Sequence, residues 1–278
     1  MDSVKPSTDR ADGLPADLEA VVAAVLASAK NRAIAPDYVA ALARRELTRG
    51  SVKEAIKATK NQLHQVAGAY LATRPPYGQW LEELRAAAGT PALKPLCARL
   101  LAHHASTRER LPQLEAFYAA VFAALPPVRT VIDVACGLNP LALPWLPLAP
   151  GAAYYAYDIY TDLMAFLGEW LTIAGVGGAA VARDVSAACP EQPADLALVL
   201  KFLPLLDQLE RGAALRLLDG LRTPRIVVSF PTRSLGGRAK GMGENYSVRF
   251  RQLTAARPWT VRELAAPGEL VFLVEKPM

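Results

Sequence analysis

The spacing of apolar residues divides the chain into two parts. Up to about residue 110, apolar residues recur three and four positions apart, which is typical of amphipathic helices. Pro36 stands at an expected helix start, and Gly50 and Gly89 mark breaks between helices. We therefore expect an all-helical N-terminal domain, residues 1–106, with a polar leader and helices at 16–30, 36–48, 51–73, 80–88 and 91–104.

The second part begins with a further expected helix at 107–125 and continues with short apolar runs. Helical patterns separate most of these runs, which predicts βαβ units and a parallel sheet. The last two runs are joined by only a few residues, so they must be antiparallel. The expected domain, residues 107–278, is α/β, with strands at 131–135, 152–157, 179–183, 194–200, 225–230, 259–264 and 269–275.

A tight glycine turn follows the first predicted strand. This strand runs into Ala135, Cys136 and Gly137, and the next strand ends in Asp158, about twenty residues further on. Glycine lets the backbone approach a ligand closely, and an acid at the end of the neighbouring strand can accept hydrogen bonds from ribose hydroxyls. The pattern indicates a cofactor that carries a nucleoside, although a plain structural turn would look the same.

The turn lacks the three spaced glycines that cradle a pyrophosphate, since Leu138, Asn139 and Pro140 follow Gly137. S-adenosylmethionine has an adenosine but no phosphate, so it fits better than a dinucleotide. Five parallel strands closed by an antiparallel hairpin form the Rossmann-like sheet of class I methyltransferases. We expect this sheet, with a helical N-terminal domain and S-adenosylmethionine as cofactor.

The composition is that of a soluble enzyme. The chain has 278 residues, of which 52% are hydrophobic, and this is enough for a large core. No apolar run approaches the length of a membrane span, and Cys97, Cys136 and Cys189 are too widely spaced for a zinc site or a disulfide framework. We expect a cytoplasmic protein with reduced thiols, no metal and no membrane partner.

Positive charge gathers in two segments of a chain whose net charge is +5. Residues 30–60 hold eight Lys or Arg against three acids, and residues 222–262 hold nine against Glu244 alone. Two basic segments on either side of a cofactor site could together grip a polyanion. A single basic helix, by contrast, is often only a solvated face.

Several motifs resemble the aminoglycoside-resistance 16S rRNA guanine-N(7) methyltransferases. They are HHASTRERL at 103–111, DVACGLNPL at 133–141, LKFLPLLD at 200–207 and SFPTRSLGGR at 229–238, with NQLHQVAGAY at 61–70 in the helical part. The resemblance spans nearly the whole chain. It implies methylation of guanine 1405 of 16S rRNA within the assembled small (30S) subunit, where added bulk and positive charge would repel cationic aminoglycosides.

The resemblance also implies roles in cofactor binding. Asp158 would accept from both ribose hydroxyls and Asp184 from the adenine amino group, although either could instead cap a following helix. Ala135 and Gly137 would offer backbone to the methionine part of the cofactor. Tyr70 would cover the cofactor or, equally, pack in the core.

Arg110 would bind the carboxylate of the cofactor in a charge-assisted contact. The alternative is an arginine at a helix start that pairs with Glu109 or Glu115. Lys201 would steer RNA phosphate or hold a base carbonyl, unless its stem merely packs while its head reaches solvent.

No catalytic acid or base is expected. Nitrogen 7 of guanine has a lone pair and no proton, so its alkylation needs alignment rather than a proton relay or a covalent nucleophile such as Cys189. We therefore expect packing, capping or RNA contact from His64, His103 and His104.

The basic residues would serve the RNA. In A-form RNA the nitrogen 7 edge faces a deep, narrow groove, so the enzyme must unstack the nucleotide or act on distorted RNA. Residues of the helical domain would dock on ribosomal RNA, and others after the fifth strand would lie near the target. The expected docking residues are Arg44, Arg45, Lys53, Lys57 and Lys60, and Arg233, Arg238 and Lys240 are the expected target-side residues.

Two rival functions stay open at this point. A small-molecule methyltransferase would share the cofactor strands but would not need two basic segments. A noncatalytic ribosome-binding protein would keep the basic surface but has no reason to keep the cofactor turn and its carboxylates.

Overall fold

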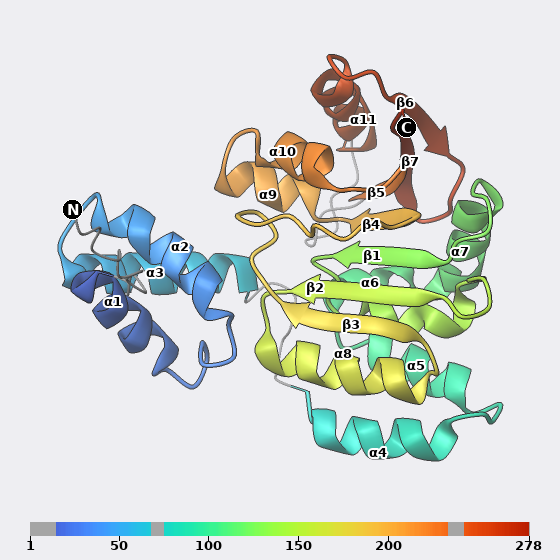
Figure 1. The fold of residues 1–278 in the computed structure, drawn as a ribbon, viewed down its shortest axis with the longest axis horizontal. Coiled ribbons are helices and arrows are strands. Elements are labelled where there is room, and N and C mark those ends of the chain that lie inside the picture. Colours follow the sequence, from blue (N-terminus) through green and yellow to red (C-terminus); the bar gives the residue numbers. More distant parts are fainter. Residues whose placement is uncertain (1–14, 68–74, 233–241, 278) are drawn as a thin grey trace, which may run out of the picture.

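The computed structural model describes residues 15–67, 75–232 and 242–277. Its first three helices form a bundle that stands to one side of the sheet (Figure 1). They are α1 (Ala16–Leu26), α2 (Pro36–Leu47) and α3 (Val52–Ala67). Their apolar faces meet in a small core of their own that includes Leu18, Val39 and Leu63. Pro36 is the first residue of α2, as the sequence predicts.

A seven-stranded sheet forms the centre of the rest of the chain, in the order β3-β2-β1-β4-β5-β7-β6. The first five strands are parallel, and β7 runs antiparallel to both β5 and β6. This arrangement confirms the predicted α/β fold with the Rossmann-like sheet of class I methyltransferases. The strands are β1 (Thr130–Val134), β2 (Ala153–Asp158), β3 (Gly177–Ala182), β4 (Leu196–Leu200), β5 (Arg225–Pro231), β6 (Thr260–Leu264) and β7 (Glu269–Glu275).

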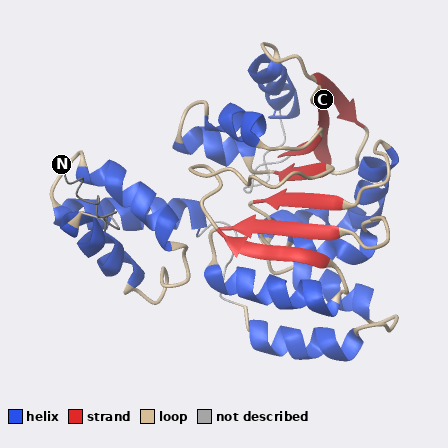
Figure 2. Ribbon diagram, viewed as in Figure 1, coloured by secondary structure: helices blue, strands red, loops and turns tan. Residues whose placement is uncertain are grey.

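Helices cover both faces of the sheet, as Figure 2 shows. Successive residues of a strand point to opposite faces, so Val131 and Ile132 of β1 are buried in two separate apolar clusters. The Val131 face packs against α4 (Tyr77–Ala87), α5 (Leu93–Leu101) and α8 (Thr161–Ile173), together with the segment that precedes β1. The Ile132 face packs against α9 (Leu203–Leu209), α10 (Ala213–Gly220) and α11 (Met242–Thr254).

Helices α4 and α5 share the core of the sheet rather than that of the N-terminal bundle. Trp80, Leu84, Cys97 and Leu100 are buried in the same cluster as Val131. The domain boundary expected from the sequence follows residue 106, and it places α4 and α5 in the N-terminal domain with α1–α3. In the structure these two helices do not contribute to the core of the α1–α3 bundle.

The segment before β1 differs from the single helix expected at 107–125. It consists of α6 (Ala105–Arg110), a 3₁₀ turn (Leu111–Gln113) and α7 (Leu114–Ala123). The expectation was wrong because it ignored Pro112, which has no N–H to donate to the preceding turn. Further upstream, residues 68–73 of the expected helix 51–73 lie outside the described part of the chain. Within the described residues, no helix is long and apolar enough to cross a membrane.

Candidate functional site

A pocket opens at the carboxyl ends of β1, β2 and β4, where parallel sheets of this kind bind ligands. The lining includes the glycine turn, the carboxylates of Asp158 and Asp184, and aromatic side chains. The predicted residues Ala135, Gly137, Asp158, Asp184 and Lys201 all line it. Apolar side chains complete its wall, namely Leu163, Val185, Leu200, Phe202, Leu205 and Leu206.

The glycine turn has the geometry that its sequence predicts. Ala135 and Gly137 both have positive φ angles, 51° and 50°. A Cβ atom at position 137 would lie 2.8 Å from Nε2 of His104, and real Cβ atoms do not come so close to another heavy atom. Glycine therefore suits position 137 for two reasons: it adopts a positive φ without strain, and it leaves room for the ring of His104.

Asp158 ties the end of β2 to this turn. Its Oδ2 atom accepts a hydrogen bond of 2.9 Å from the backbone N–H of Gly137, and Oδ1 accepts one of 2.7 Å from Ile159. Burial raises the pKa of Asp158, while these backbone hydrogen bonds favour its charged form. Helix α8 begins two residues after Ile159 and has no side-chain cap, so Asp158 does not act as its N-cap.

Asp184 lies beyond the end of β3 and is 4% exposed. Its Oδ1 atom accepts hydrogen bonds from the backbone N–H and the hydroxyl of Ser186, which shape a turn rather than the start of a helix. Its own backbone N–H donates to Oδ2 of Asp37 in α2, at 3.2 Å. The N-terminal bundle thus contacts the backbone of the residue predicted to bind adenine.

Arg110 is buried in a bidentate ion pair with Glu269. The Nε–Oε1 distance is 2.8 Å and the Nη2–Oε2 distance is 3.1 Å, while Nη1 donates to Oδ1 of Asn139 at 2.9 Å. Burial alone would lower the pKa of Arg110, but the charge of Glu269 raises it. Neither Glu109 nor Glu115, the expected alternatives, is the partner. Arg110 does not line the pocket.

Lys201 follows β4 with a positive φ of 57°, and its side chain is 6% exposed. Nζ donates to the backbone oxygen of Ser106 at 2.7 Å and to Oε2 of Glu109 at 2.9 Å, and it lies 3.3 Å from Oε1 of Glu269. Its charged head therefore meets two carboxylates instead of reaching solvent. Burial alone would raise the pKa of Glu269, but the charges of Arg110 and Lys201 lower it.

Asp133 and Asn139 continue this buried network beneath the turn. Oδ2 of Asp133 accepts from Nδ2 of Asn139 at 2.9 Å and from the hydroxyl of Tyr154 at 2.6 Å. Burial raises the pKa of Asp133 to about 6. Through Asn139 and Arg110 the network reaches Glu269, so it joins β1, β2, α6 and β7 below the pocket.

The three histidines lie in different settings. His104 lines the pocket, and burial, followed by the positive charges of Lys201, Arg110 and Arg108, lowers its pKa to about 4. It is therefore neutral near pH 7. The ring of His103 packs 4.9 Å from that of Trp80, and Nδ1 of His64 lies 2.9 Å from Nζ of Lys30.

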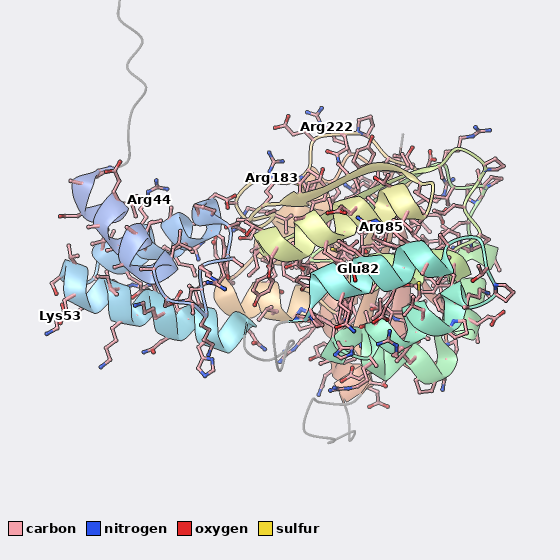
Figure 3. The ribbon with its side chains drawn as sticks, turned by 90° about the horizontal axis from the view of Figure 1, so that it is seen from below. Arg44, Lys53, Glu82, Arg85, Arg183 and Arg222 are labelled. Atoms are coloured by element: carbon pink, nitrogen blue, oxygen red, sulfur yellow. The ribbon has the colours of Figure 1, made fainter. Side chains whose placement is uncertain are left out.

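The basic residues predicted to dock RNA lie on the N-terminal bundle, and none of them lines the pocket. Figure 3 shows Arg44 and Lys53 projecting outward from it. Lys53, Lys57 and Lys60 are spaced four and three residues apart on α3, so they share one face of that helix. Arg45 is exposed but forms an ion pair of 2.6 Å with Glu210, which ties α2 to the end of α9.

Four predicted residues, Tyr70, Arg233, Arg238 and Lys240, lie outside the described part of the chain. Within the described residues, no group of three or more His, Cys, Asp or Glu is placed to hold a metal ion. All three cysteines are free thiols. Cys189 does not line the pocket, and burial raises its pKa.

Sequence reasoning missed Tyr38, Asn139 and Glu269. Tyr38 comes from the first turn of α2 and lines the pocket beside Asp184. Glu269 opens β7, which the sequence predicts as a strand without singling out its first residue. The signal for Asn139 was present, since it lies within the glycine-turn motif at 133–141.

Comparison with known proteins gives a consistent result. The family model described as "Ribosomal RNA methyltransferase (FmrO)" matches residues 27–273. A 16S rRNA (guanine(1405)-N(7))-methyltransferase of Frankia casuarinae is 45% identical over 91% of this chain and 91% of its own length. One of Micromonospora echinospora is 38% identical over 93% of this chain and 97% of its own length.

Solved structures agree. The 16S rRNA methyltransferase RmtF, determined in complex with S-adenosyl-L-homocysteine, superposes with a TM-score of 0.77 at 33% identity, covering 95% of this chain and all of its own. The 16S rRNA methylase RmtB superposes with a TM-score of 0.75 at 33% identity and covers 95% of this chain and all of its own.

Proposed function

Because the chain belongs to the FmrO family of ribosomal RNA methyltransferases, we propose that it transfers a methyl group from S-adenosylmethionine to nitrogen 7 of guanine 1405 in 16S rRNA. This modification confers resistance to aminoglycosides. The substrate is the assembled 30S subunit. The observation that carries the proposal is the pocket at the carboxyl ends of β1, β2 and β4, where a glycine turn and two carboxylates meet.

The described residues of the pocket fit this cofactor. The carboxylate of Asp158 accepts from the backbone N–H groups of Gly137 and Ile159, and its further lone pairs can accept a ribose hydroxyl. Asp184 is held by Ser186 and faces the same pocket, where it can accept from an adenine amino group. The turn at Ala135 and Gly137, which has no room for a larger residue at position 137, brings backbone to the methionine part.

We propose Arg110 as the group that binds the cofactor's carboxylate. Arg110 is 3% exposed and points to Glu269, so this contact requires it to give up a bond to Glu269 and turn toward the pocket. The carboxylate of Glu269 would then be compensated by Lys201, which already lies 3.3 Å away.

The bound cofactor supplies an activated methyl group on a positively charged sulfur. The chain's own contribution is to hold that methyl in line with the target nitrogen, and such alignment is worth at most about 7–11 kcal/mol. Neutral His104 adds no repulsion to the positively charged sulfur, and Glu109 and Glu269 offset Lys201. Transfer leaves positive charge on the base. The carboxylates beside Lys201 therefore favour the product more than an unpaired lysine would.

RNA binding is assigned to basic surfaces on both parts of the chain. The exposed side chains of Arg44, Lys53 and Lys57 on the bundle would meet phosphates of the folded ribosomal RNA. Two further residues would extend this surface. Lys60 lies on the same face of α3, and Arg45 stays exposed although it pairs with Glu210. Arg233, Arg238 and Lys240, which follow β5, would act nearer the target, and Lys201 would position the base.

Methyl transfer to isolated 30S subunits tests the proposal. The protein is mixed with S-adenosylmethionine labelled in the methyl group and with either 30S subunits or protein-free 16S rRNA. We expect labelled 16S rRNA from the subunits and little or none from the free RNA. A protein that binds the cofactor but labels neither substrate would overturn the proposed function, and labelling of free RNA alone would overturn the assembled subunit as substrate.

A further inference from the structure

One wall of the pocket comes from the N-terminal bundle. Tyr38, in the first turn of α2, lines the pocket together with Asp184, Val185 and Ser186, which follow β3. Tyr38 is 5% exposed, so its ring is enclosed where the bundle meets the sheet. Tyr38 lies more than a hundred residues before Asp184 in the chain, so the packing of the bundle against the sheet brings the two residues to the same pocket.

The bundle is held against this end of the pocket by backbone contacts. The N–H of Ala35 donates to the oxygen of Ile159 at 2.7 Å, and the N–H of Thr161 donates to the oxygen of Ala33 at 2.7 Å. These bonds join the residues just before α2 to the loop that follows Asp158.

A side chain adds a second link. Asp37 accepts from the backbone N–H of Tyr38 at 2.8 Å through Oδ1 and from that of Asp184 at 3.2 Å through Oδ2. A single carboxylate therefore fixes the first turn of α2 relative to Asp184. The position of the Tyr38 ring is set by the same contacts that set the loops around the adenosine end of the pocket.

The chemistry of Tyr38 complements that of Asp184. Burial, and then the nearby charge of Asp184, raise the pKa of Tyr38 to about 12, so its hydroxyl keeps its proton near pH 7. Among the contacts of the described residues, none is a hydrogen bond of this hydroxyl. Asp184 is an acceptor and Tyr38 a donor, and an adenine edge offers a donor, the amino group, flanked by acceptors at nitrogens 1 and 7.

We propose that Tyr38 is a cofactor-binding residue of the N-terminal bundle: its ring packs against the adenine and its hydroxyl donates to a ring nitrogen beside the amino group. This inference rests on the cofactor placement proposed above. It makes the bundle part of the cofactor site as well as an RNA-docking surface. Helix α2 then carries Tyr38 in its first turn and Arg44 in its last.

Calorimetric titration with S-adenosylhomocysteine tests the inference on the full chain. We expect Tyr38→Leu to weaken binding more than tenfold, and Tyr38→Phe to weaken it roughly fivefold through loss of one hydrogen bond. Val39→Ala is the matched control, because Val39 is fully buried in the core of the bundle and does not line the pocket. It loosens the bundle without touching the ligand, and its binding should stay within twofold of the parent.

A second arm separates contact from packing. Two analogues of S-adenosylhomocysteine carry carbon in place of nitrogen 1 or nitrogen 7 of the adenine. If the hydroxyl donates to one of these nitrogens, the analogue that lacks that nitrogen cannot accept the hydrogen bond. It should therefore bind the parent and Tyr38→Phe equally well. Equal losses on Tyr38→Phe for all three ligands would overturn the hydrogen bond.

The proposed function and this inference fail in different ways. If the parent protein does not bind S-adenosylhomocysteine, the proposed cofactor itself is wrong. If the parent binds it and Asp158→Ala weakens binding, but Tyr38→Leu binds like the parent, then only the role of Tyr38 is wrong. A loss on Val39→Ala as large as that on Tyr38→Leu would likewise assign Tyr38 to packing.

Discussion

Arg110 and Glu269 form a buried bidentate ion pair across 159 residues of sequence, with Nε–Oε1 at 2.8 Å and Nη2–Oε2 at 3.1 Å. The pair fastens α6 to the start of β7 directly below the cofactor pocket. Lys201 lies 3.3 Å from the same carboxylate and also pairs with Glu109 at 2.9 Å, so Glu269 is the carboxylate that the two buried cations share. The site therefore depends on Glu269 for its charge balance.

Glu269→Gln should lower the free energy of unfolding by about 3–5 kcal/mol, because it leaves Arg110 buried without the charge of its bidentate partner and leaves Lys201 with Glu109 alone. Denaturant unfolding at pH 7 measures the effect. Glu263→Gln is the control, since it removes an exposed partner of Arg251 and should cost less than about 1 kcal/mol. Equal losses in the two variants would contradict the central role of Glu269.

The pH dependence of this pair has a definite sign. The pKa of Glu269 is lowered in the folded state, so its stabilisation is present above the ordinary pKa of a glutamate. It is lost as the pH falls through the lower folded value. The difference in stability between the parent and Glu269→Gln should therefore shrink on acidification.

Asp133 should behave in the opposite way. Burial raises its pKa to about 6, so the folded protein binds this proton more tightly than the unfolded chain does. Its contribution favours folding below the unfolded pKa of about 4 and is lost as the pH rises through about 6. Asp133→Asn removes this dependence and can still accept from Tyr154 and Asn139.

Unfolding of the parent and of Asp133→Asn at pH 5 and pH 8 checks this prediction. We expect the variant to gain stability relative to the parent, by about 1–2 kcal/mol, between pH 5 and pH 8. A relative stability that does not change with pH would show that Asp133 is ionised in the folded protein throughout this range.

Asp158→Ala should weaken cofactor binding by about 1.5–3 kcal/mol while the protein stays folded, since it removes the proposed ribose acceptor. Titration calorimetry with S-adenosylmethionine measures the loss. Asp195→Ala is a matched control, because Asp195 also accepts from two backbone N–H groups, those of Arg129 and Thr130, at the opposite end of β1. Parent-like affinity in a folded Asp158→Ala variant would remove Asp158 from the site.

Neutralising Arg44, Lys53 and Lys57 together should weaken binding to 30S subunits and flatten its dependence on salt, because fewer counterions are released. Arg45 is left intact, since its ion pair with Glu210 holds the bundle in place. Arg222→Gln is the control, because this exposed residue lies just before the amino end of β5, whereas the pocket lies at the carboxyl ends of the strands, and Figure 3 shows it away from the bundle. If the triple variant keeps the parent's affinity at every salt concentration, the bundle is not the docking surface.

The features predicted correctly from sequence are mostly local. The parallel strands follow from the alternation of short apolar runs with helical patterns, and the place of Asp158 follows because it ends the strand after the glycine turn. Asp184 required the family resemblance, since neither spacing nor composition marks it. Each of these residues stands at the end of a predicted strand.

The features that were missed depend on packing between distant segments. Nothing near Glu269 in the sequence shows that β7 enters the sheet beside β5 and brings this acid to Arg110. Tyr38 is a buried helical residue by its pattern, and only the docking of the bundle places it in the pocket. Helices α4 and α5 look like those of the bundle in sequence, although they pack on the sheet.

Mapping the methylated position in 16S rRNA tests the central claim most directly. Isolated 30S subunits are treated with the protein and S-adenosylmethionine, and the extracted RNA is reduced and cleaved with aniline, which breaks the chain at 7-methylguanosine. Primer extension then locates the break. The proposed function predicts one new stop, at guanine 1405, that is weaker with Asp158→Ala when the cofactor is kept well below saturation. A methylated subunit RNA with no cleavage at guanine 1405, or with cleavage at another guanine, would contradict it.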